Sequence, residues 1–161
     1  MIEIRKTRLE DVSACAAIYD RAREFMKSVG NKDQWAGGYP NADDVINDIA
    51  LGASYVVTEG DKILAVFYFR VENDPTYERI FEGEWLDNSE YAVIHRVAVA
   101  EAGKGIVGRI FDYCYAEFPH LRIDTHRLNA PMLRALRKNG FSRRGMIYLS
   151  KGDERIAFEK I

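Results

Sequence analysis

The sequence predicts an α/β protein with about seven β-strands and about four α-helices, in a single domain spanning residues 1–161. Two periodicities support this prediction: apolar residues recur at helical spacing in some segments, and β-branched or aromatic residues alternate or cluster in others. The third observation is the length of 161 residues with 47% apolar side chains, which suits one core and not two ordinary domains.

The predicted elements follow one another without repeats or linkers. They are a strand at 2–4, a helix up to residue 30, an aromatic and glycine-rich loop at 34–40, a helix at 41–52, a hairpin of 54–58 and 63–69, a polar connection at 72–90, a strand at 91–99, a helix at 106–118, a strand at 121–125, a helix at 130–139 and a closing pair of strands joined at 151–153. Thr7 to Glu10 match a capping box for the first helix, and Asn41 suits the cap of the second. Pro131 fits the first turn of the last helix.

The composition narrows the classes of partner and compartment. A net charge of -2 gives no field of one sign that would attract nucleic acid or an anionic membrane. Cys15 and Cys114 lie far apart among apolar residues, which favours buried free thiols over a disulfide or metal site. No signal-peptide pattern and no apolar run near the roughly 20 residues of a membrane span is found. We expect a cytoplasmic protein without metal, nucleic-acid partner or membrane association.

Three glycines within the six residues from Gly103 to Gly108 mark a turn between a predicted strand and a predicted helix. Backbone amides and the positive end of the helix dipole converge there on an anion, and Lys104 and Arg109 add positive charge. A tight turn without a ligand is the plainer alternative. The density of glycine favours a site for the pyrophosphate of a nucleotide-type cofactor.

The same segment also fits the GxGxxG pattern of dinucleotide-binding folds, with Asp124 about 20 residues further along. A dinucleotide-binding oxidoreductase is therefore a rival hypothesis. Against it, residues 100–102 separate the turn from its strand, whereas the dinucleotide turn normally follows its strand at once. The unit also begins too late in the chain to build a doubly wound sheet.

The order of elements resembles that of the GCN5-related N-acetyltransferase (GNAT) family over nearly the whole chain. In that family an Arg/Gln-x-x-Gly-x-Gly/Ala turn binds the pyrophosphate of coenzyme A, and residues 102–107 match it except at Ala102 and Val107. Gly108 partly offsets the larger residue at position 107. The resemblance implies a mixed, mostly antiparallel central sheet with splayed central strands, and acetyl-CoA as co-substrate.

The resemblance also implies which residues hold coenzyme A. The strand backbone would pair with the pantetheine arm and the turn would hold the pyrophosphate, which involves Val97, Ala98, Val99, Gly103, Lys104, Gly105, Ile106, Val107 and Gly108. Asn129 opens the helix that ends at Gly140-Phe141 and would hydrogen-bond the cofactor, with a plain helix cap as the alternative. Leu136 stands where many relatives carry a tyrosine as general acid, so that acid is missing or replaced.

Acetyl transfer to an amine requires side chains that accept and donate protons beside the thioester. In the family the strand before the turn and the following strand splay apart around the thioester, which places His95, Asp124 and His126 best. If the second strand continues through both, Asp124 and His126 share a face, and the carboxylate raises the proton affinity of the imidazole. His126 is the preferred acid or base. For either histidine, a packed residue without catalytic role is the alternative.

Loop residues are the candidates for the acceptor site. The connection from Glu72 to Glu90 carries seven acidic residues and one basic residue, which would attract a cationic amine, unless it is only a solvated connection. Trp35, Tyr39 and Trp85 lie in loops and would line an acceptor pocket together with Glu84. Packing beneath long loops is the alternative for these aromatic residues.

The function predicted from these features is transfer of the acetyl group of acetyl-CoA to a primary amine of a small molecule, by direct attack on the thioester. A catalytically silent acyl-CoA-binding or regulatory module is the alternative suggested by Ala102, Val107 and Leu136. The dinucleotide-binding oxidoreductase stands third. The acceptor, the acyl chain length and the oligomeric state stay open, with a homodimer as one option.

Overall fold

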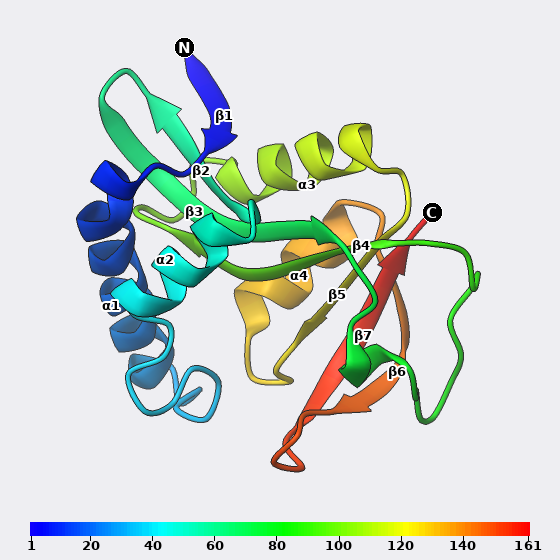
Figure 1. Ribbon diagram of the computed structural model, residues 1–161. Helices are drawn as coiled ribbons and strands as arrows, with labels where there is room; N and C mark the ends of the chain where they lie inside the picture. The colour runs from blue at the N-terminus through cyan, green and yellow to red at the C-terminus, as the bar shows by residue number, and fades with distance from the viewer. The chain divides into compact units, whose positions relative to one another are not determined.

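The computed structural model describes residues 1–161 and contains the predicted strands and helices (Figure 1). The strands are β1 (Ile2–Lys6), β2 (Ser54–Glu59), β3 (Lys62–Val71), β4 (Ala92–Val99), β5 (Leu121–Thr125), β6 (Ser142–Tyr148) and β7 (Glu154–Lys160). The helices are α1 (Val12–Ser28), α2 (Ala42–Ala50), α3 (Ile106–Glu117) and α4 (Ala130–Lys138), with 3₁₀ turns η1 (Leu9–Asp11) and η2 (Pro75–Tyr77). Most boundaries lie within one or two residues of those predicted from periodicity.

The strands form a 7-stranded sheet in the order β1-β2-β3-β4-β5-β7-β6. Antiparallel pairing joins β1 to β2, β2 to β3, β5 to β7 and β6 to β7. Between β4 and β5 the pairing is parallel and covers only Ala92↔Leu121 and Val93↔Arg122, although both strands continue. The predicted mixed, mostly antiparallel sheet is therefore confirmed, and the short β4–β5 register fits strands that splay.

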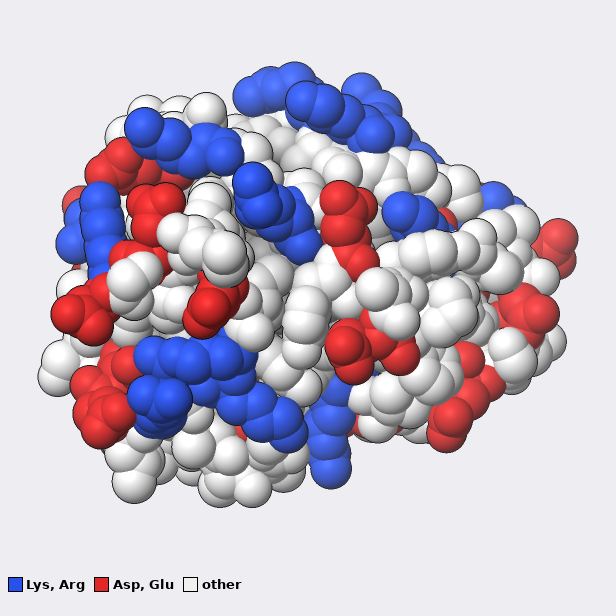
Figure 2. Space-filling view, turned by 90° about the horizontal axis from the view of Figure 1, so that it is seen from above, with Lys and Arg blue, Asp and Glu red and all other residues white.

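The chain divides into two compact units. The first contains Met1–Phe69 and His95–Ile110, and the second contains Arg70–Ile94 and Phe111–Ile161. The single domain spanning residues 1–161 stays a prediction. No helix combines the length and the apolarity needed to cross a membrane. On the face seen in Figure 2, basic and acidic side chains lie among one another.

In the first unit, α1 and α2 lie side by side (Figure 1), and their apolar faces pack with β2, β3 and β4. The buried members of this core are Cys15, Ile18, Tyr19, Val45, Val56, Val66 and Ala98. Both cysteines of the chain are free and buried, as expected, and burial raises the pKa of the Cys15 thiol to about 12. A thiol in this environment stays protonated and packs as a small apolar group.

The first helix begins differently from the prediction. The predicted capping box at Thr7 to Glu10 is wrong, because the cap forms between Arg8 and Asp11 instead. The Arg8 amide donates to Asp11 Oδ2 at 2.8 Å, and the Asp11 amide donates to the Arg8 carbonyl. Thr7 is buried and its Oγ1 accepts from the Ser54 hydroxyl at 2.7 Å. Tertiary pairing of Thr7 therefore shifts the cap by one residue. The predicted cap at Asn41 is confirmed, since its side chain accepts from two amides of α2.

In the second unit, the acidic connection from residue 72 to residue 90 is mostly exposed yet anchored to β6 and β7. Phe81 forms an isolated antiparallel bridge with Met146. A Cβ on Gly83 would lie 1.8 Å from the Arg144 carbonyl oxygen, so only glycine permits this close approach. The Leu86 amide donates at 2.6 Å to Glu159, whose side chain is fully buried. The connection thus has a defined path that its composition does not reveal.

Candidate acetyl-CoA and acceptor site

The glycine turn has the backbone geometry that a phosphate cradle requires. Gly103 and Gly105 have φ angles of 81° and 69°, in the left-handed region that favours glycine, and nothing lies within 4 Å of a Cβ built on either. The first hydrogen bond of α3 runs from the Arg109 amide to the Gly105 carbonyl, so the amides just before Arg109 lie at the open end of the helix. Amides at a helix start have no partner within the helix, and together with the open space at Gly103 and Gly105 they fit a pyrophosphate.

The end of β4 before the turn is held in the first unit by core packing and by a hydrogen bond to β3. Ala98 is buried in the core, while Val97 and Val99 are half-buried. At the end of β4 the Ala100 amide donates to the Leu64 carbonyl of β3 at 2.8 Å. After the turn, Ile106 is buried, whereas Val107 and Gly108 keep partial exposure. The predicted cofactor residues of this unit therefore form one continuous, well-anchored segment.

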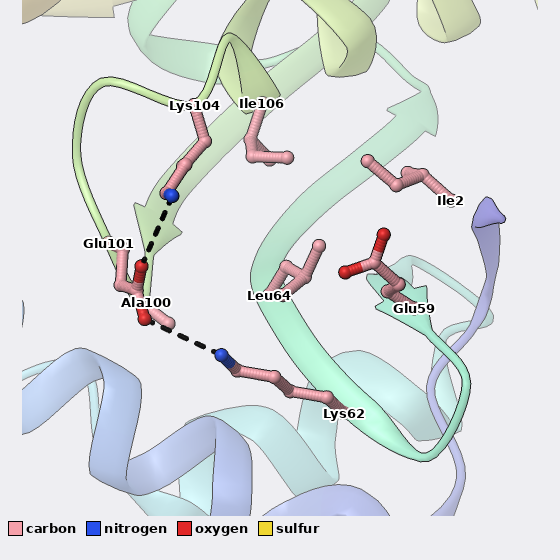
Figure 3. A pocket seen from close by; sticks show the side chains of 8 residues that line it. All are labelled: Ile2, Glu59, Lys62, Leu64, Ala100, Glu101, Lys104 and Ile106. Atoms are coloured by element: carbon pink, nitrogen blue, oxygen red, sulfur yellow. Dashed lines mark hydrogen bonds and ion pairs between the residues drawn. The ribbon is translucent and has the colours of Figure 1, made fainter.

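A pocket of about 310 Å³ lies beside the turn (Figure 3). Its lining comes from β1, the β2–β3 hairpin and the turn: Ile2, Glu59, Lys62, Leu64, Ala100, Glu101, Lys104 and Ile106. The ammonium group of Lys104 points toward Glu101 there, at 3.9 Å from Oε2, and Lys62 pairs with the other carboxylate oxygen at 3.4 Å. Glu101 thus offsets part of the positive charge that Lys104 brings to the turn. Because these side chains are exposed, the pairs are weak.

A cluster of polar side chains surrounds Arg96 of β4 in the same unit. Its Nη2 donates to Asp48 Oδ2 of α2 at 2.7 Å, and its Nη1 donates to the Tyr39 hydroxyl at 2.8 Å. Its guanidinium lies 4.7 Å from the ring centroid of Tyr68, and its backbone carbonyl accepts from the Tyr19 hydroxyl. Arg96 has a φ of 51°, the left-handed region that a non-glycine residue seldom occupies. We call Tyr19, Tyr39, Asp48, Tyr68 and Arg96 the Arg96 cluster.

Burial sets the protonation behaviour of this cluster. It raises the pKa of the Asp48 carboxyl, against the opposing effect of Arg96, and it also raises the pKa of the Tyr39 hydroxyl. Burial lowers the pKa of the Arg96 guanidinium, but the interactions with Tyr39 and Asp48 raise it by more, so the pKa is raised overall. Arg96 is therefore charged at every physiological pH, and Asp48 serves as its counter-ion.

Three residues predicted for the chemistry or the acceptor pocket lie around the Arg96 cluster. Tyr39 belongs to it and keeps 38% of its surface exposed. The Trp35 ring packs edge-on against Tyr19 with centroids 5.6 Å apart, and the His95 ring lies 5.5 Å from that of Tyr68. The first unit thus brings Trp35, Tyr39 and His95 together beside the cofactor strand.

The condition under which Asp124 and His126 would share a strand face is not met in the second unit, because β5 ends at Thr125 and His126 lies beyond it. Asp124 Oδ2 instead accepts from the buried Tyr77 hydroxyl at 2.6 Å. The buried His126 accepts at Nδ1 from the Leu128 amide at 3.1 Å, which leaves Nε2 to carry the proton of the neutral ring. The catalytic role of both residues stays a prediction.

Other predicted residues of the second unit have structural contacts. The Asn129 side chain accepts from the Met132 amide at 3.3 Å as an N-cap of α4, and Leu136 is fully buried. Trp85 donates to the Tyr77 carbonyl, and its ring lies 4.0 Å from the guanidinium of Arg122. The contact of Asn129 is that of a plain helix cap, and the contacts of Trp85 are those of a residue packed beneath a long loop. Cofactor binding by Asn129 and acceptor binding by Trp85 stay predictions, as does acceptor binding by the exposed Glu84.

No group of three or more His, Cys, Asp and Glu side chains is arranged to hold a metal ion.

No protein-family model matches the chain, and no curated protein matches its sequence. Among solved structures, an acetyltransferase of the GNAT family from Streptococcus agalactiae 2603 is 30% identical, with a TM-score of 0.92 over 99% of this chain and 95% of that one. The chain belongs to the GNAT family.

Two more distant structures share the GNAT fold. An N-acetyltransferase from Staphylococcus aureus Mu50 is 18% identical, with a TM-score of 0.63 over 100% of this chain and 98% of that one. The protein yncA from Salmonella typhimurium, solved with its cofactor acetyl-CoA, is 16% identical, with a TM-score of 0.67 over 98% and 92% of the two chains. The comparisons support acetyl transfer in general for this GNAT protein.

Arg96, Asp48 and Tyr77 of this GNAT protein were not predicted from the sequence. Arg96 could have been noticed, because it is a charged residue within the largely apolar run from Tyr91 to Val99. Such a charge is tolerated in a strand core only with a partner, but its partner lies 48 residues away. Tyr77 gave no signal, because it lies in a polar connection, yet its side chain is buried and its ring contacts those of Trp85 and Tyr91.

Proposed function

We propose that this protein transfers the acetyl group of acetyl-CoA to a primary amine of a small molecule. The observation that carries the proposal is the turn at Gly103 to Gly108, whose left-handed glycines lead into the start of α3, where helix-start amides suit a pyrophosphate. Lys104 is exposed and rotates toward a phosphate by giving up a weak pair with Glu101. The free thiols of Cys15 and Cys114 support work in a reducing compartment such as the cytoplasm.

The proposed reaction is direct attack by the neutral amine on the thioester carbonyl. A carbon–nitrogen bond forms, the carbon–sulfur bond breaks, and the coenzyme A thiolate leaves with the electron pair of that bond. The amine gives up one proton and the thiolate takes one up. We assign this proton transfer to His126, whose Nε2 carries the proton in the neutral ring, with Asp124 as a second group and His95 as the alternative.

The acceptor is proposed to approach as a protonated amine and to release one proton to solvent before the neutral amine attacks the thioester. Acidic side chains of the connection from residue 72 to residue 90, among them Glu82 and Glu84, are exposed and would raise the local concentration of a protonated amine. Trp35 and Tyr39 are proposed as walls of the acceptor pocket, since both are aromatic, lie in one loop and keep exposed surface.

Thiol release from acetyl-CoA with a panel of small amines tests this proposal, and steady release with at least one amine is the expected result. The matched binding experiment compares Gly105→Glu with Gly60→Glu. Both glycines have a positive φ, 69° and 59°, and open space at Cβ, so both substitutions impose the same kind of backbone strain. Only Gly105→Glu puts a carboxylate into the anion site, so it should weaken acetyl-CoA binding about 100-fold or more. Equal affinities of the two folded variants would exclude the turn as the cofactor site.

A silent acyl-CoA-binding module is the second candidate. It is favoured by Leu136, which is fully buried and offers no proton donor where many relatives carry a tyrosine. This candidate predicts acetyl-CoA binding that depends on Gly105, without thiol release for any amine in the panel.

A further inference from the structure

Arg96 combines two features that a residue of plain structural purpose would avoid. Its backbone is left-handed in the middle of β4, where an extended conformation is the ordinary one. Its Nε is buried without a hydrogen-bond partner. Strained backbone and an unsatisfied polar atom persist only where surrounding contacts hold them, and both features concentrate at functional sites.

The contacts that hold the Arg96 side chain come from three different segments. Its two terminal nitrogens donate hydrogen bonds, one to Asp48 of α2 at 2.7 Å and the other to the Tyr39 hydroxyl at 2.8 Å. The Tyr68 ring of β3 covers one side of the guanidinium. Tyr39 alone among these partners lies in the loop between α1 and α2 and keeps exposed surface. Arg96 therefore ties this loop to the strand that continues into Val97, Ala98 and Val99.

We propose that Arg96 is a positioning residue for the acceptor pocket, because it fixes Tyr39, as one wall, to the cofactor strand. This inference rests on the proposed function, since it assigns a wall to the acceptor of the same reaction. The ion pair with Asp48 holds the guanidinium in place, and the planar fork of Arg96 divides its two donors between Asp48 and Tyr39. Lysine has a single flexible ammonium and does not span both partners in this way.

The test measures the KM for the amine, the KM for acetyl-CoA and kcat in Arg96→Gly, Arg96→Lys and Tyr39→Phe. Glycine removes the side chain and tolerates the left-handed backbone, so it separates the contacts of Arg96 from its strain. We expect the acceptor KM to rise about tenfold in Arg96→Gly and about threefold in Tyr39→Phe, which loses only one hydrogen bond. The KM for acetyl-CoA should stay unchanged, and Arg96→Lys should lie between wild type and Arg96→Gly.

Asp11→Asn is the matched control, because Asp11 forms the other Arg–Asp pair at 2.7 Å in this unit and lies outside the proposed site. It should leave both KM values at the wild-type level. An unchanged acceptor KM in folded Arg96→Gly and Tyr39→Phe overturns the proposal, as does a change confined to kcat. If Arg96→Gly does not fold, Tyr39→Phe decides alone.

A second readout does not depend on activity. The chain has two tryptophans, so Trp85→Phe leaves Trp35 in the α1–α2 loop as the sole fluorescent reporter. In this background, Arg96→Gly should make Trp35 more accessible to acrylamide quenching, and Asp11→Asn should not. Equal quenching in all variants overturns the positioning role. If wild type releases no thiol with any amine, the proposed function fails, while quenching still tests how Arg96 holds the loop.

Discussion

Two Arg–Asp pairs in the first unit have the same length and different surroundings. Arg5–Asp11 and Arg96–Asp48 both measure 2.7 Å, and both aspartates are nearly buried. Asp11 accepts three donors, two from Arg5 and one from the Arg8 amide, and these hydrogen bonds hold its pKa below the ordinary value. Asp48 accepts from Arg96 through one oxygen, and burial raises its pKa.

We infer from this difference in surroundings that the Arg5–Asp11 pair stabilises the fold, whereas the Arg96–Asp48 pair serves the proposed acceptor site. The carboxylate of Asp11 is favoured by folding, because each oxygen is satisfied at the start of α1. Ionised Asp48 is disfavoured by burial, and its partner Arg96 adds a strained backbone. A buried charge pair on a strained backbone is weak evidence for a role in stability, so we explain this pair by the acceptor site proposed above.

The largest expected effect concerns His126, which belongs to neither pair and is assigned to proton transfer. His126→Ala should lower kcat about 100-fold, the usual scale for loss of a general acid or base, without changing acetyl-CoA affinity. Steady-state kinetics with His95→Ala as the control measures this effect. A collapse of kcat in His95→Ala alone would move the role to β4.

The next effect is on stability at pH 7. Asp11→Asn should lower the free energy of unfolding by about 2 kcal/mol, because one amide oxygen does not satisfy three donors. Asp48→Asn should cost less, since one oxygen suffices for its bond to Arg96 and the buried charge is removed. Urea denaturation of the two variants measures the difference. A larger loss for Asp48→Asn would contradict the assignment of the two pairs.

The stability difference between wild type and each of these two variants should respond differently to pH. A lowered pKa for Asp11 means that its contribution is complete above the ordinary value of 3.8 and is lost as pH falls through the lower, folded-state value. A raised pKa for Asp48 means that wild type loses stability relative to Asp48→Asn as pH rises above 3.8. Between pH 4 and pH 7, urea denaturation should therefore show a constant difference for Asp11→Asn and a shrinking one for Asp48→Asn.

The smallest effect involves the exposed pair beside the turn. Glu101→Gln should free Lys104 for the pyrophosphate and lower the KM for acetyl-CoA about two- to threefold, with a smaller change at high salt. Kinetics at two ionic strengths measures it. A raised KM would mean that Glu101 supports the turn rather than competing with the phosphate.

The element order was predictable because it depends on local patterns. The glycines at 103 and 105, the Asn41 cap and the closing hairpin carry their signals within a few residues. The polar contacts were not predictable in the same way. Arg96 and Asp48 are 48 residues apart, and Tyr77 and Asp124 are 47 apart, so no local spacing indicates either pair.

The same limit applies to Thr7 and to the pair of Asp124 and His126. Thr7 has the right chemistry for a cap, but a hydrogen bond to Ser54 of a distant strand takes it out of that role. The face shared by Asp124 and His126 required the strand to continue by one more residue, and β5 ends at Thr125. Candidate residues could be named from their types, whereas their partners are set by tertiary packing.

The most direct test of the central claim is isothermal titration of the wild-type protein with acetyl-CoA and with NAD in parallel. The geometry of the glycine turn and membership of the GNAT family predict saturable binding of one acetyl-CoA per chain and no heat of binding with NAD. Saturable binding of NAD without binding of acetyl-CoA would contradict the account and assign the turn to a dinucleotide.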